Sequence, residues 1–457
     1  MTVHESVLDA VGETPLVRLV RVTSGLQPAV YGKVEFSNPG GSVKDRAALA
    51  MVREAERTGA LPPTGGVIVE ATSGNTGVGL AMVAAQHGHR AVCVVPNTIA
   101  REKVTLLQAY GAEVVQTIGT LPREHPDHVK NLAASIAART PGGWYANQYD
   151  NPANPLVHEL TTGPEIWTQT GGRVTHLVAG IGTGGTITGT GRFLSRHGVT
   201  VVGADPEASV YGGGDGSPYY VESVGHYRHP ATVGEDSPDV YDPAVVDRII
   251  RVPDRESLGV TRALAREEGL LVGGSSGCAV AAALRLAAEL GPDDLVVVVL
   301  PDSGRNYLSK YFDDGWMTRF GFQDAAAGPR VRDVLPPADG LAVAPAGAPV
   351  SEVLRAHRAG PVAVIVPRES GDPTRSAPEV LGVVTVEALR ALLDAEPGRA
   401  DDDVARHAVR APAVGAGEAV AAAATRLGAV DEPAGEHVLL LVDGRVVAVR
   451  PAAPLRG

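Results

Sequence analysis

Apolar and polar positions alternate in blocks along the first two thirds of the chain. Apolar runs such as GVIVEAT, RAVCVVP and THLVAGI are each followed by a stretch with helical spacing, and AEVVQTIG and TVVGADP continue the series. Strand-like runs that alternate with helical stretches are typical of an α/β fold with a mainly parallel sheet. The pattern predicts this fold over residues 1–322.

The pattern changes near residue 322. QDAAAGPR has the composition of a linker, and two rough helix and strand copies follow it: PVSEVLRAHRAGPVAVIVP with LGVVTVEALRALL, then AVAAAATRLGAVDEP with HVLLLVDGRVVAV. We expect a linker at 323–331 and a small C-terminal α+β module at 332–457. Within the module, PRESGDPTRSAPE is expected to be a mobile loop.

Composition and charge narrow the function. The net charge is -12 over 457 residues with acids and bases interspersed, which argues against a nucleic-acid partner. Cys93 and Cys278 lie in apolar settings and form no metal or disulfide pattern, so we expect a reduced, cytoplasmic compartment. No basic segment followed by an apolar one starts the chain, and no apolar run approaches ~18 residues, so neither export nor membrane insertion is expected.

A lysine at the start of a helix is the first candidate for chemistry. In FSNPGGSVKDRAA, Ser42 is a predicted N-cap, Asp45 follows in a box-like position, and AALAMVREAER continues the helix to Gly59. Lys44 then lies in the first turn, where the helix dipole and desolvation both favour a neutral amine. A neutral lysine suits Schiff-base chemistry with a carbonyl cofactor. An exposed lysine that tolerates a small dipole penalty is the alternative.

Polar side chains also gather where a strand meets a helix in EATSGNTGVGLAMVAA. Thr72, Ser73, Asn75 and Thr76 occupy this junction, so hydroxyls, an amide and free backbone N–H groups converge at a positive helix end. This arrangement predicts a cradle for a carboxylate or a phosphate. A glycine-rich turn with a capping residue is the simpler alternative.

The stretch VAGIGTGGTITGTG supports two different functions. Gly180, Gly182 and Gly185 fit GxGxxG after a strand, and Asp205 follows about 20 residues later, as a dinucleotide-binding oxidoreductase requires. The threonines of the same stretch suit instead a compact cup around one terminal phosphate.

A buried strand in VVVVLPDSGRNYLSKYFDDGWM delivers Asp302 and Ser303 to a loop. Ser303 could equally be only a helix cap at the strand exit.

Together these segments resemble a known family. GETPLVRL, NPGGSVKDRAA, ATSGNTG, NQYDNPANPLVHELTTGPEIW, GTGGTITG, EEGLLVGGSSG and PDSGRNYLSKYF are similar to motifs of the fold-type II pyridoxal-phosphate enzymes of the cysteine synthase and cystathionine β-synthase family. The resemblance covers about 1–320 and implies two parallel-sheet α/β subdomains, pyridoxal 5'-phosphate as cofactor, and a homodimer. The C-terminal module resembles a degenerate pair of the regulatory CBS motifs that follow many cystathionine β-synthases.

The resemblance also implies roles for individual residues. Lys44 would be the Schiff-base lysine and proton shuttle. The residues that would hold the cofactor are Asn75, Gly182, Thr183, Gly184, Gly185, Thr186 and Ser303. The residues that would bind the substrate are Thr72, Ser73, Thr76, Gln148, Ser223, Gly225 and His226.

The implied reaction is β-replacement on L-serine or an O-activated serine through an aminoacrylate, with amino-acid and thiol substrates. Serine with homocysteine is favoured by the attached module and by Gly273 and Gly274 in LVGGSSG. Cysteine synthesis from O-acetylserine or O-phosphoserine with sulfide, or a specialised biosynthetic β-replacement, is the alternative. A nucleotide-dependent oxidoreductase and a non-catalytic metabolite sensor also stay open.

The chain departs from the family pattern in two segments. YYVESVGHYRHP lacks a glycine, a tyrosine and an acidic and aromatic pair that the family pattern has. VPNTIAREK lacks a Met and a Ser of that pattern. The departing residues are Ser223, His226, Arg228, His229, Thr98 and Ala100. The cationic or titratable groups could signal an acidic or phosphorylated substrate, or could simply point to solvent.

The module departs from nucleotide-binding copies of its motif. Ala388 stands where an Asp would follow Thr385, and the neighbouring Glu387 is turned by about 100° on a helix. We expect weak or absent binding of adenosyl ligands, which calorimetry with S-adenosylmethionine and AMP would test. No haem is implied, because no Cys and His pair precedes the catalytic domain.

Overall fold

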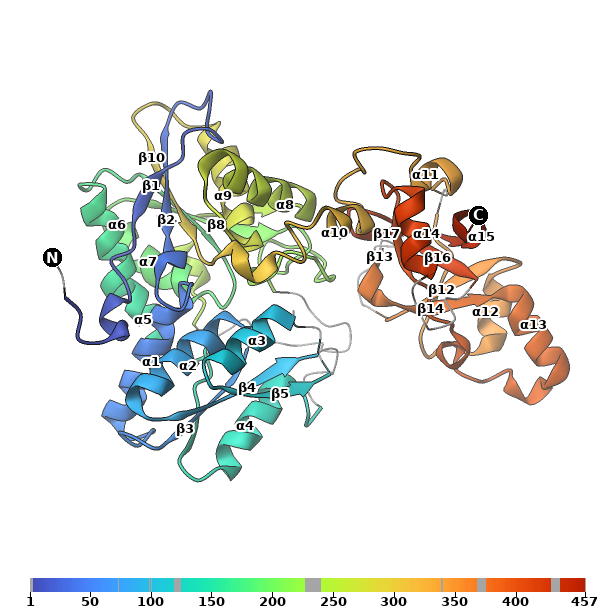
Figure 1. Ribbon diagram of the computed structural model, residues 1–457, viewed down its shortest axis with the longest axis horizontal. Helices are drawn as coiled ribbons and strands as arrows, with labels where there is room; N and C mark the ends of the chain where they lie inside the picture. Colours follow the sequence, from blue (N-terminus) through green and yellow to red (C-terminus); the bar gives the residue numbers. More distant parts are fainter. Residues whose placement is uncertain are drawn as a thin grey trace. The chain divides into compact units, whose positions relative to one another are not determined.

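The computed structural model describes residues 3–72, 74–97, 99, 101–118, 125–226, 240–337, 340–367, 375–428 and 436–456. These residues form two compact units. The first contains residues up to 214, 221–226 and 240–308, and the second contains 215–220 and the residues from 309 onward (Figure 1). The predicted domain division at residue 322 stays a prediction.

One parallel sheet of the first unit has the strand order β5-β4-β3-β6. Its strands are β3 (Val67–Ala71), β4 (Arg90–Pro96), β5 (Glu113–Thr117) and β6 (Gly143–Tyr145). The helices of this part are α1 (Lys44–Thr58), α2 (Asn75–His87), α3 (Arg101–Ala109) and α4 (Val129–Arg139). Ile68 and Cys93 pack in a core with α1 and α2, whereas Val67 and Val69 pack with α4. Both faces of the sheet are therefore covered, as a parallel sheet requires.

A second sheet has the order β1-β2-β10-β7-β8-β9, and only the β1–β2 pair is antiparallel. Its strands are β1 (Leu16–Arg18), β2 (Ala29–Val34), β7 (His176–Gly180), β8 (Thr200–Pro206), β9 (Arg248–Val252) and β10 (Leu295–Leu300). Its helices are α5 (Ala153–Val157), α6 (Gly163–Gln169), α7 (Gly185–Ser195), α8 (Asp254–Ala263) and α9 (Gly274–Ala287). Residues of α6 and α7 share a core with β7, β8 and β10, and α9 contacts the same strands. The predicted α/β fold with mainly parallel sheet is confirmed.

The helix that begins at Lys44 differs from its predicted start by one residue. Val43, with helical dihedral angles, occupies the N-cap position, and the hydroxyl of Ser42 accepts the N–H of Lys44 at 3.2 Å. The backbone of Ser42 is meanwhile bridged to Asp302, which fixes the entry of the helix. Gly59 ends the helix with φ 77°, as predicted.

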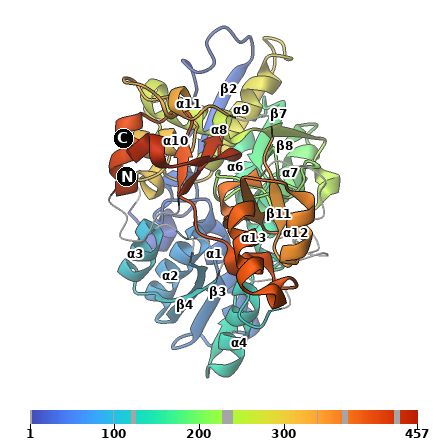
Figure 2. The ribbon, with the colours of Figure 1, turned by 90° about the vertical axis from the view of Figure 1, so that its right-hand side faces the viewer.

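The second unit contains a three-stranded and a four-stranded sheet. The first is formed by β11 (Val343–Pro345), β12 (Pro361–Ile365) and β14 (Val380–Thr385), and the second by β13 (Arg375–Ser376), β15 (Ala413–Gly415), β16 (His437–Val442) and β17 (Arg445–Pro451). Its helices are α10 (Asp314–Arg319), α11 (Val331–Val334), α12 (Val350–Ala356), α13 (Val386–Ala395), α14 (Val420–Gly428) and α15 (Ala453–Arg456). Helices α12 and α13 contact each other (Figure 2). The two helix and strand copies are present, and the CBS-motif identity stays a prediction.

Two local features of this unit bear on the predictions. The expected mobile loop is structured at its end, because Ser376 donates to Glu379 in a capping box next to β13; residues 368–374 lie outside the described residues. Thr385 caps α13 by accepting the N–H of Ala388, while the Glu387 carboxylate accepts the N–H of Gly360. The Glu387 carboxylate therefore has a structural contact, with the backbone of Gly360. Within the described ranges, no helix is long and apolar enough to cross a membrane.

Candidate active site

A pocket in the first unit lies where several elements end. It is bordered by the first turn of α1, the first turn of α2, the loop after β7 and the end of β10. Its lining residues are Val43, Lys44, Asn75, Ala179, Gly180, Gly182, Thr183, Gly184, Thr186, Ser223, Val299 and Pro301. Ligands of parallel α/β sheets bind outside the carboxyl ends of strands, and β7 and β10 end here.

Lys44 is the cation of this pocket. Its Nζ lies 3.4 Å from the Thr183 hydroxyl, a weak contact. Burial lowers the pKa of the Lys44 amine to about 8, against an opposing influence of the Glu70 carboxyl. The amine is therefore far easier to deprotonate than an exposed lysine, which supports the neutral-amine prediction over the exposed alternative.

The other lysines are differently placed. The chain has five lysines, and Lys33 and Lys103 are held by the carboxylates of Glu165 and Glu222 at 2.7 and 2.5 Å.

Most polar side chains of the 70–76 junction bond within the fold. The hydroxyl of Thr72 accepts the N–H groups of Gly74 and Gly77, and Thr76 donates to the Gln148 side-chain oxygen at 2.6 Å. Glu70 is buried, and burial raises the pKa of its carboxyl to about 8. Thr72 and Thr76 thus bond within the fold at the start of α2, and among the described residues of this junction Asn75 lines the pocket.

The loop after β7 has the shape of a small cup. Gly184 has φ 89°, and a Cβ atom there would lie 2.4 Å from the Cβ of Tyr241, so only glycine fits. A Cβ on Gly185 would lie 2.3 Å from the Asn154 side-chain oxygen. Thr183, Gly184 and Thr186 therefore line the pocket at the start of α7, and a helix N-terminus, with its free N–H groups, is where proteins commonly bind an anion.

Thr186 is itself supported from behind. Its hydroxyl lies 3.2 Å from Nε2 of His158, whose Nδ1 lies 2.9 Å from the Thr162 hydroxyl. Burial, with the cations Arg46 and Lys44, keeps the pKa of His158 well below its ordinary value. The imidazole is therefore neutral and can hold the threonine hydroxyl in place.

A buried carboxylate links Asn75 to the loop after β10. Asn75 donates its amide N–H to Asp302 at 2.7 Å, and the Tyr307 hydroxyl donates to the same oxygen at 2.6 Å. Ser303 caps the 3-10 turn Gly304–Tyr307 by accepting the N–H of Arg305. The capping alternative for Ser303 is thus observed, and its role toward a cofactor stays a prediction.

The segment 221–226 reaches the pocket through one side chain. Ser223 has φ 68° and lines the pocket, and its hydroxyl lies 3.3 Å from that of Tyr307. The N–H of Gly225 donates to Ile181, and the His226 backbone bonds Ser209 and Val210, which ties the segment to β7 and β8. The side chain of His226 lies against the ring of Tyr211, with centroids 5.9 Å apart.

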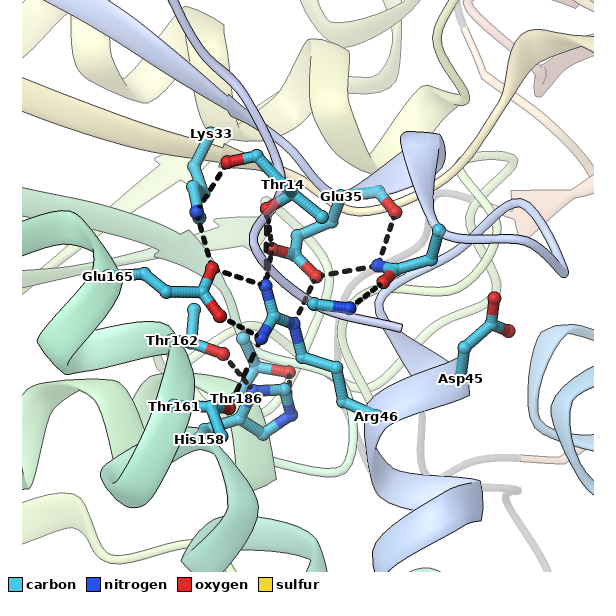
Figure 3. A network of polar contacts seen from close by, with 12 residues as sticks. Thr14, Lys33, Glu35, Asp45, Arg46, His158, Thr161, Thr162, Glu165 and Thr186 are labelled. Carbon is cyan, nitrogen blue, oxygen red and sulfur yellow. Dashed lines mark hydrogen bonds and ion pairs between the residues drawn. The ribbon is translucent and has the colours of Figure 1, made fainter. Parts of the chain in front are cut away.

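A buried polar network lies behind the first turn of α1 (Figure 3). Arg46 donates four bonds of 2.6 to 2.9 Å to the carboxylates of Glu35 and Glu165. Lys33 adds bonds to Glu165, the carbonyl of Thr14 and Gln169. Burial lowers the pKa of Arg46, but the two carboxylates outweigh it and raise that pKa above its ordinary value. The network fixes α1 against β2 and α6.

The predicted site residues fall into three groups: those that line the pocket, those beside it or in its supporting loops, and those outside the described residues. The predicted site residues that line the pocket are Lys44, Asn75, Gly182, Thr183, Gly184, Thr186 and Ser223. Those placed next to it or in its supporting loops are Thr72, Thr76, Gln148, Gly185, Gly225, His226 and Ser303. Those outside the described residues are Ser73, Thr98, Ala100, Arg228 and His229.

Other polar residues of the site were missed by the sequence reasoning. They are Arg46, His158, Glu165 and Tyr307. The i, i+4 spacing of His158 and Thr162 is a usable signal for one of these contacts.

Asp205, the acid of the oxidoreductase alternative, serves the fold. It is fully buried, it accepts the N–H of Gly212 at 2.7 Å, and burial raises its pKa to about 6. A ribose-binding carboxylate needs to be exposed toward its ligand, so this alternative loses its key residue.

A second group of polar side chains lies away from the pocket. Glu56, His87 and His89 bring three potential metal-ligand atoms within 4.8 Å of one another. However, Nδ1 of His89 accepts the N–H of Gly66, so its proton is on Nε2 and is donated to Glu56 at 2.8 Å. A ring nitrogen that carries a proton cannot bind a metal, so this group is better described as a hydrogen-bonded clamp.

The pocket fits the cofactor implied by the sequence resemblance. A glycine and threonine cup at a helix N-terminus matches a phosphate, and an amine with a lowered pKa matches an aldehyde. Asn75, with one amide N–H on Asp302, has a second N–H for a ring oxygen. These are features of the residues themselves.

Comparison with known proteins gives a consistent result. Residues 7–302 match the family model described as pyridoxal-phosphate dependent enzyme. The chain is 41% identical over 320 residues to cystathionine beta-synthase of Apis mellifera, across 69% of this chain and 63% of that protein. It is 42% identical over 317 residues to cysteine synthase of Staphylococcus aureus strain Mu50, across 68% of this chain and 98% of that protein.

A solved structure is similar over the same region. The crystal structure of O-ureido-L-serine synthase is 39% identical with a TM-score of 0.62, across 68% of this chain and 96% of that chain. The chain spans 56 to 63% of the length of the cystathionine beta-synthases that it matches, but nearly the whole length of the cysteine synthase and of the O-ureido-L-serine synthase.

Proposed function

Because residues 7–302 match its model, the chain belongs to the family of pyridoxal-phosphate dependent enzymes, and from this premise we propose that it catalyses β-replacement on L-serine or an O-activated serine. The single observation that carries the proposal is the position of Lys44, whose amine has a pKa of about 8 in the same pocket as Asn75 and the 182–186 loop. Relatives with three different β-substituted amino-acid names support the same reaction class.

Each residue has a distinct task in this reaction. The 182–186 loop and Asn75 would hold the cofactor phosphate and ring oxygen, and Ser303 would meet the ring nitrogen. When bound, pyridoxal phosphate supplies an electron sink for the carbanion at the substrate Cα. Lys44 takes the α-proton as a neutral base and later returns it. Thr72, Ser73, Thr76 and Gln148 would bind the substrate carboxylate.

The electron count follows from the substituents. The β-substituent leaves with its bonding pair, as water from serine or acetate from O-acetylserine. The nucleophile supplies the new pair at Cβ and loses one proton. Lys44 is the group placed to carry the α-proton in both directions, because it is the amine in the pocket.

For the nucleophile we propose homocysteine, which gives cystathionine, with cysteine synthesis from sulfide as the second candidate. The second candidate is favoured by the near-complete coverage of the cysteine synthase relative. We also propose a homodimer, and a C-terminal unit without an adenosyl site, in keeping with the use of Glu387 by Gly360.

The test offers L-serine, O-acetylserine and O-phosphoserine in turn to the purified holoenzyme, each with homocysteine or sulfide, and identifies products by mass. Cystathionine from serine supports the first proposal, and cysteine from an activated serine supports the second. The Lys44→Ala variant is the control for non-enzymatic addition. Turnover without any β-substituted product would contradict both proposals.

A further inference from the structure

Three consecutive backbone N–H groups of the 182–186 loop have no acceptor in the part of the chain that the structure describes. They belong to Gly182, Thr183 and Gly184, which all line the pocket. Backbone N–H groups of folded proteins are almost always paired, so these three are suited to an acceptor that enters the pocket. Such a set binds an anion well only if its peptide planes are held in one orientation.

The carbonyl groups of two neighbouring peptide units are both occupied. The Ile181 carbonyl accepts the N–H of Gly225 at 2.6 Å, and the Gly182 carbonyl accepts the hydroxyl of Tyr211 at 2.8 Å. In a planar trans peptide, the C=O group and the N–H group that follows it point in opposite directions. The hydrogen bond that fixes the Gly182 carbonyl therefore also fixes the Thr183 N–H, which points away from Tyr211.

The direction of the bond from Tyr211 is fixed by its chemistry. A carbonyl oxygen can only accept, so the Tyr211 hydroxyl must donate. Burial raises the pKa of this hydroxyl above its ordinary value, so the phenol keeps its proton. The bond therefore does not depend on pH below about 10.

Two features hold Tyr211 in the turn after β8. The N–H of its neighbour Gly212 donates to the buried Asp205 carboxylate at 2.7 Å. The ring of Tyr211 packs against that of Tyr241, with centroids 5.0 Å apart, and against that of His226, with centroids 5.9 Å apart. Since both the backbone and the ring are held, the hydroxyl has few alternative positions.

We propose that Tyr211 is a positioning residue for the cofactor phosphate, and that it acts through the Gly182 carbonyl on the Thr183 N–H. Tyr211 is not among the residues that line the pocket, so it influences a bound phosphate only through the loop. This inference rests on the proposed role of the 182–186 loop and holds for any nucleophile. It also gives the buried Asp205 a task, because Asp205 holds the turn that carries Tyr211.

The experiment compares two aldehydes that differ in the phosphate. Pyridoxal 5'-phosphate and pyridoxal are titrated in turn into the full-length apoprotein, and the dissociation constant of each is measured from the imine absorbance. Tyr211→Phe removes only the hydroxyl, and we expect it to weaken the binding of pyridoxal phosphate about tenfold and that of pyridoxal less than twofold. A general loss of stability or of Lys44 reactivity would weaken both aldehydes alike, so the ratio of the two constants isolates the phosphate.

Two further variants sharpen the test. Tyr241→Phe is the matched control, because the Tyr241 ring packs on Tyr211 but, among the described residues, no hydrogen bond joins its hydroxyl to the 182–186 loop. Both constants of this variant should match the wild type. Tyr211→Leu removes the ring together with the hydroxyl, and we expect the same selective loss as in Tyr211→Phe. A loss in Tyr211→Leu alone would assign the effect to ring packing and overturn the inference.

The outcomes separate this inference from the proposed function. If the wild type prefers pyridoxal phosphate and Tyr211→Phe keeps that preference within twofold, the inference is wrong and the proposed role of the loop stands. A wild type that binds the two aldehydes equally refutes the proposed role of the loop, and the inference with it. β-Replacement is assayed separately on the loaded enzyme, so a selective loss in Tyr211→Phe supports the inference whatever the products are.

Discussion

Lys44 and Arg46 stand two residues apart in the first turn of α1, yet their surroundings are opposite. Arg46 is answered by two carboxylates and two threonine hydroxyls, and its pKa is raised. Lys44 has one weak hydroxyl contact and no facing carboxylate within hydrogen-bond distance among the described residues, and its pKa falls to about 8. The first turn of α1 thus carries the well-paired cation Arg46, which anchors the helix, and the weakly paired amine of Lys44, which is available for chemistry.

The largest effect on activity is expected from removing the weakly paired Lys44. Lys44→Ala should lower β-replacement by at least about 10²-fold, because the variant loses both the imine-forming amine and the proton carrier. Borohydride reduction of wild type loaded with the cofactor, followed by peptide mass analysis, should place the label on Lys44. Lys130→Ala, whose amine lies over the Tyr149 ring, is the matched control and should keep its label. Labelling of the Lys44→Ala chain at another lysine with full activity would refute the assignment.

The next effect concerns the stability that the buried ion pairs of Arg46 contribute. Glu165→Gln leaves Lys33 and Arg46 with one carboxylate fewer in a buried network, and should destabilise the fold by about 3–5 kcal/mol in urea unfolding at pH 7. Glu54→Gln, at the exposed pair with Arg57, should leave the free energy of unfolding nearly unchanged, because water screens this pair. Equal losses in the two variants would mean that the network is not stabilising.

The pH dependence of the Glu165 effect follows from its pKa. Burial raises this pKa, but Arg46 and Lys33 outweigh burial and lower it from 4.5 to about 2. A lowered carboxyl pKa contributes stability above the ordinary value, and that stability is lost as pH falls through the folded value. The difference between wild type and Glu165→Gln should therefore narrow as pH falls from about 4.5 toward 2.

A smaller effect tests the lowered pKa of the Lys44 amine directly. With a pKa of about 8, roughly a tenth of Lys44 is neutral at pH 7, so imine formation by the apoprotein with pyridoxal phosphate should be about tenfold slower at pH 7 than at its plateau. Stopped-flow absorbance should show the rate levelling off above pH 9. A rate that still climbs about sevenfold between pH 9 and pH 10 would indicate an ordinary lysine.

The smallest effect concerns the carboxyl that opposes burial. Glu70→Gln keeps the shape of the side chain and removes an influence that raises the Lys44 pKa. The midpoint of the same pH profile should move down by less than about one unit. A midpoint that moves up would reverse the assigned sign of the Glu70 influence.

Local sequence was sufficient for one half of this comparison. Lys44, Asn75 and the 182–186 loop could be predicted because each lies where a strand or turn meets a helix within a few residues. The confirmed strands and helices of the first unit have the same origin, since their periodicity is local.

The contacts of Arg46, in contrast, depend on partners that lie far apart in the chain. Arg46 meets Glu165 across 119 residues, and Ser223 meets Tyr307 across 84, so no spacing in the sequence reveals either contact. Ser42 was misplaced as the cap because its backbone is bridged to Asp302, again a distant partner. Packing between sheets decides such contacts, and the pattern along one segment cannot.

The scarcity of lysine has a chemical consequence for a protein that handles an aldehyde. The chain contains five lysines, and its other permanently cationic side chains are arginines, whose guanidinium groups do not form stable imines. Lys33 and Lys103 are buried and engaged by carboxylates, which removes them from competition. A reactive aldehyde that meets this surface therefore finds few wrong addresses. Selective labelling is achieved as much by what the sequence omits as by what the pocket contains.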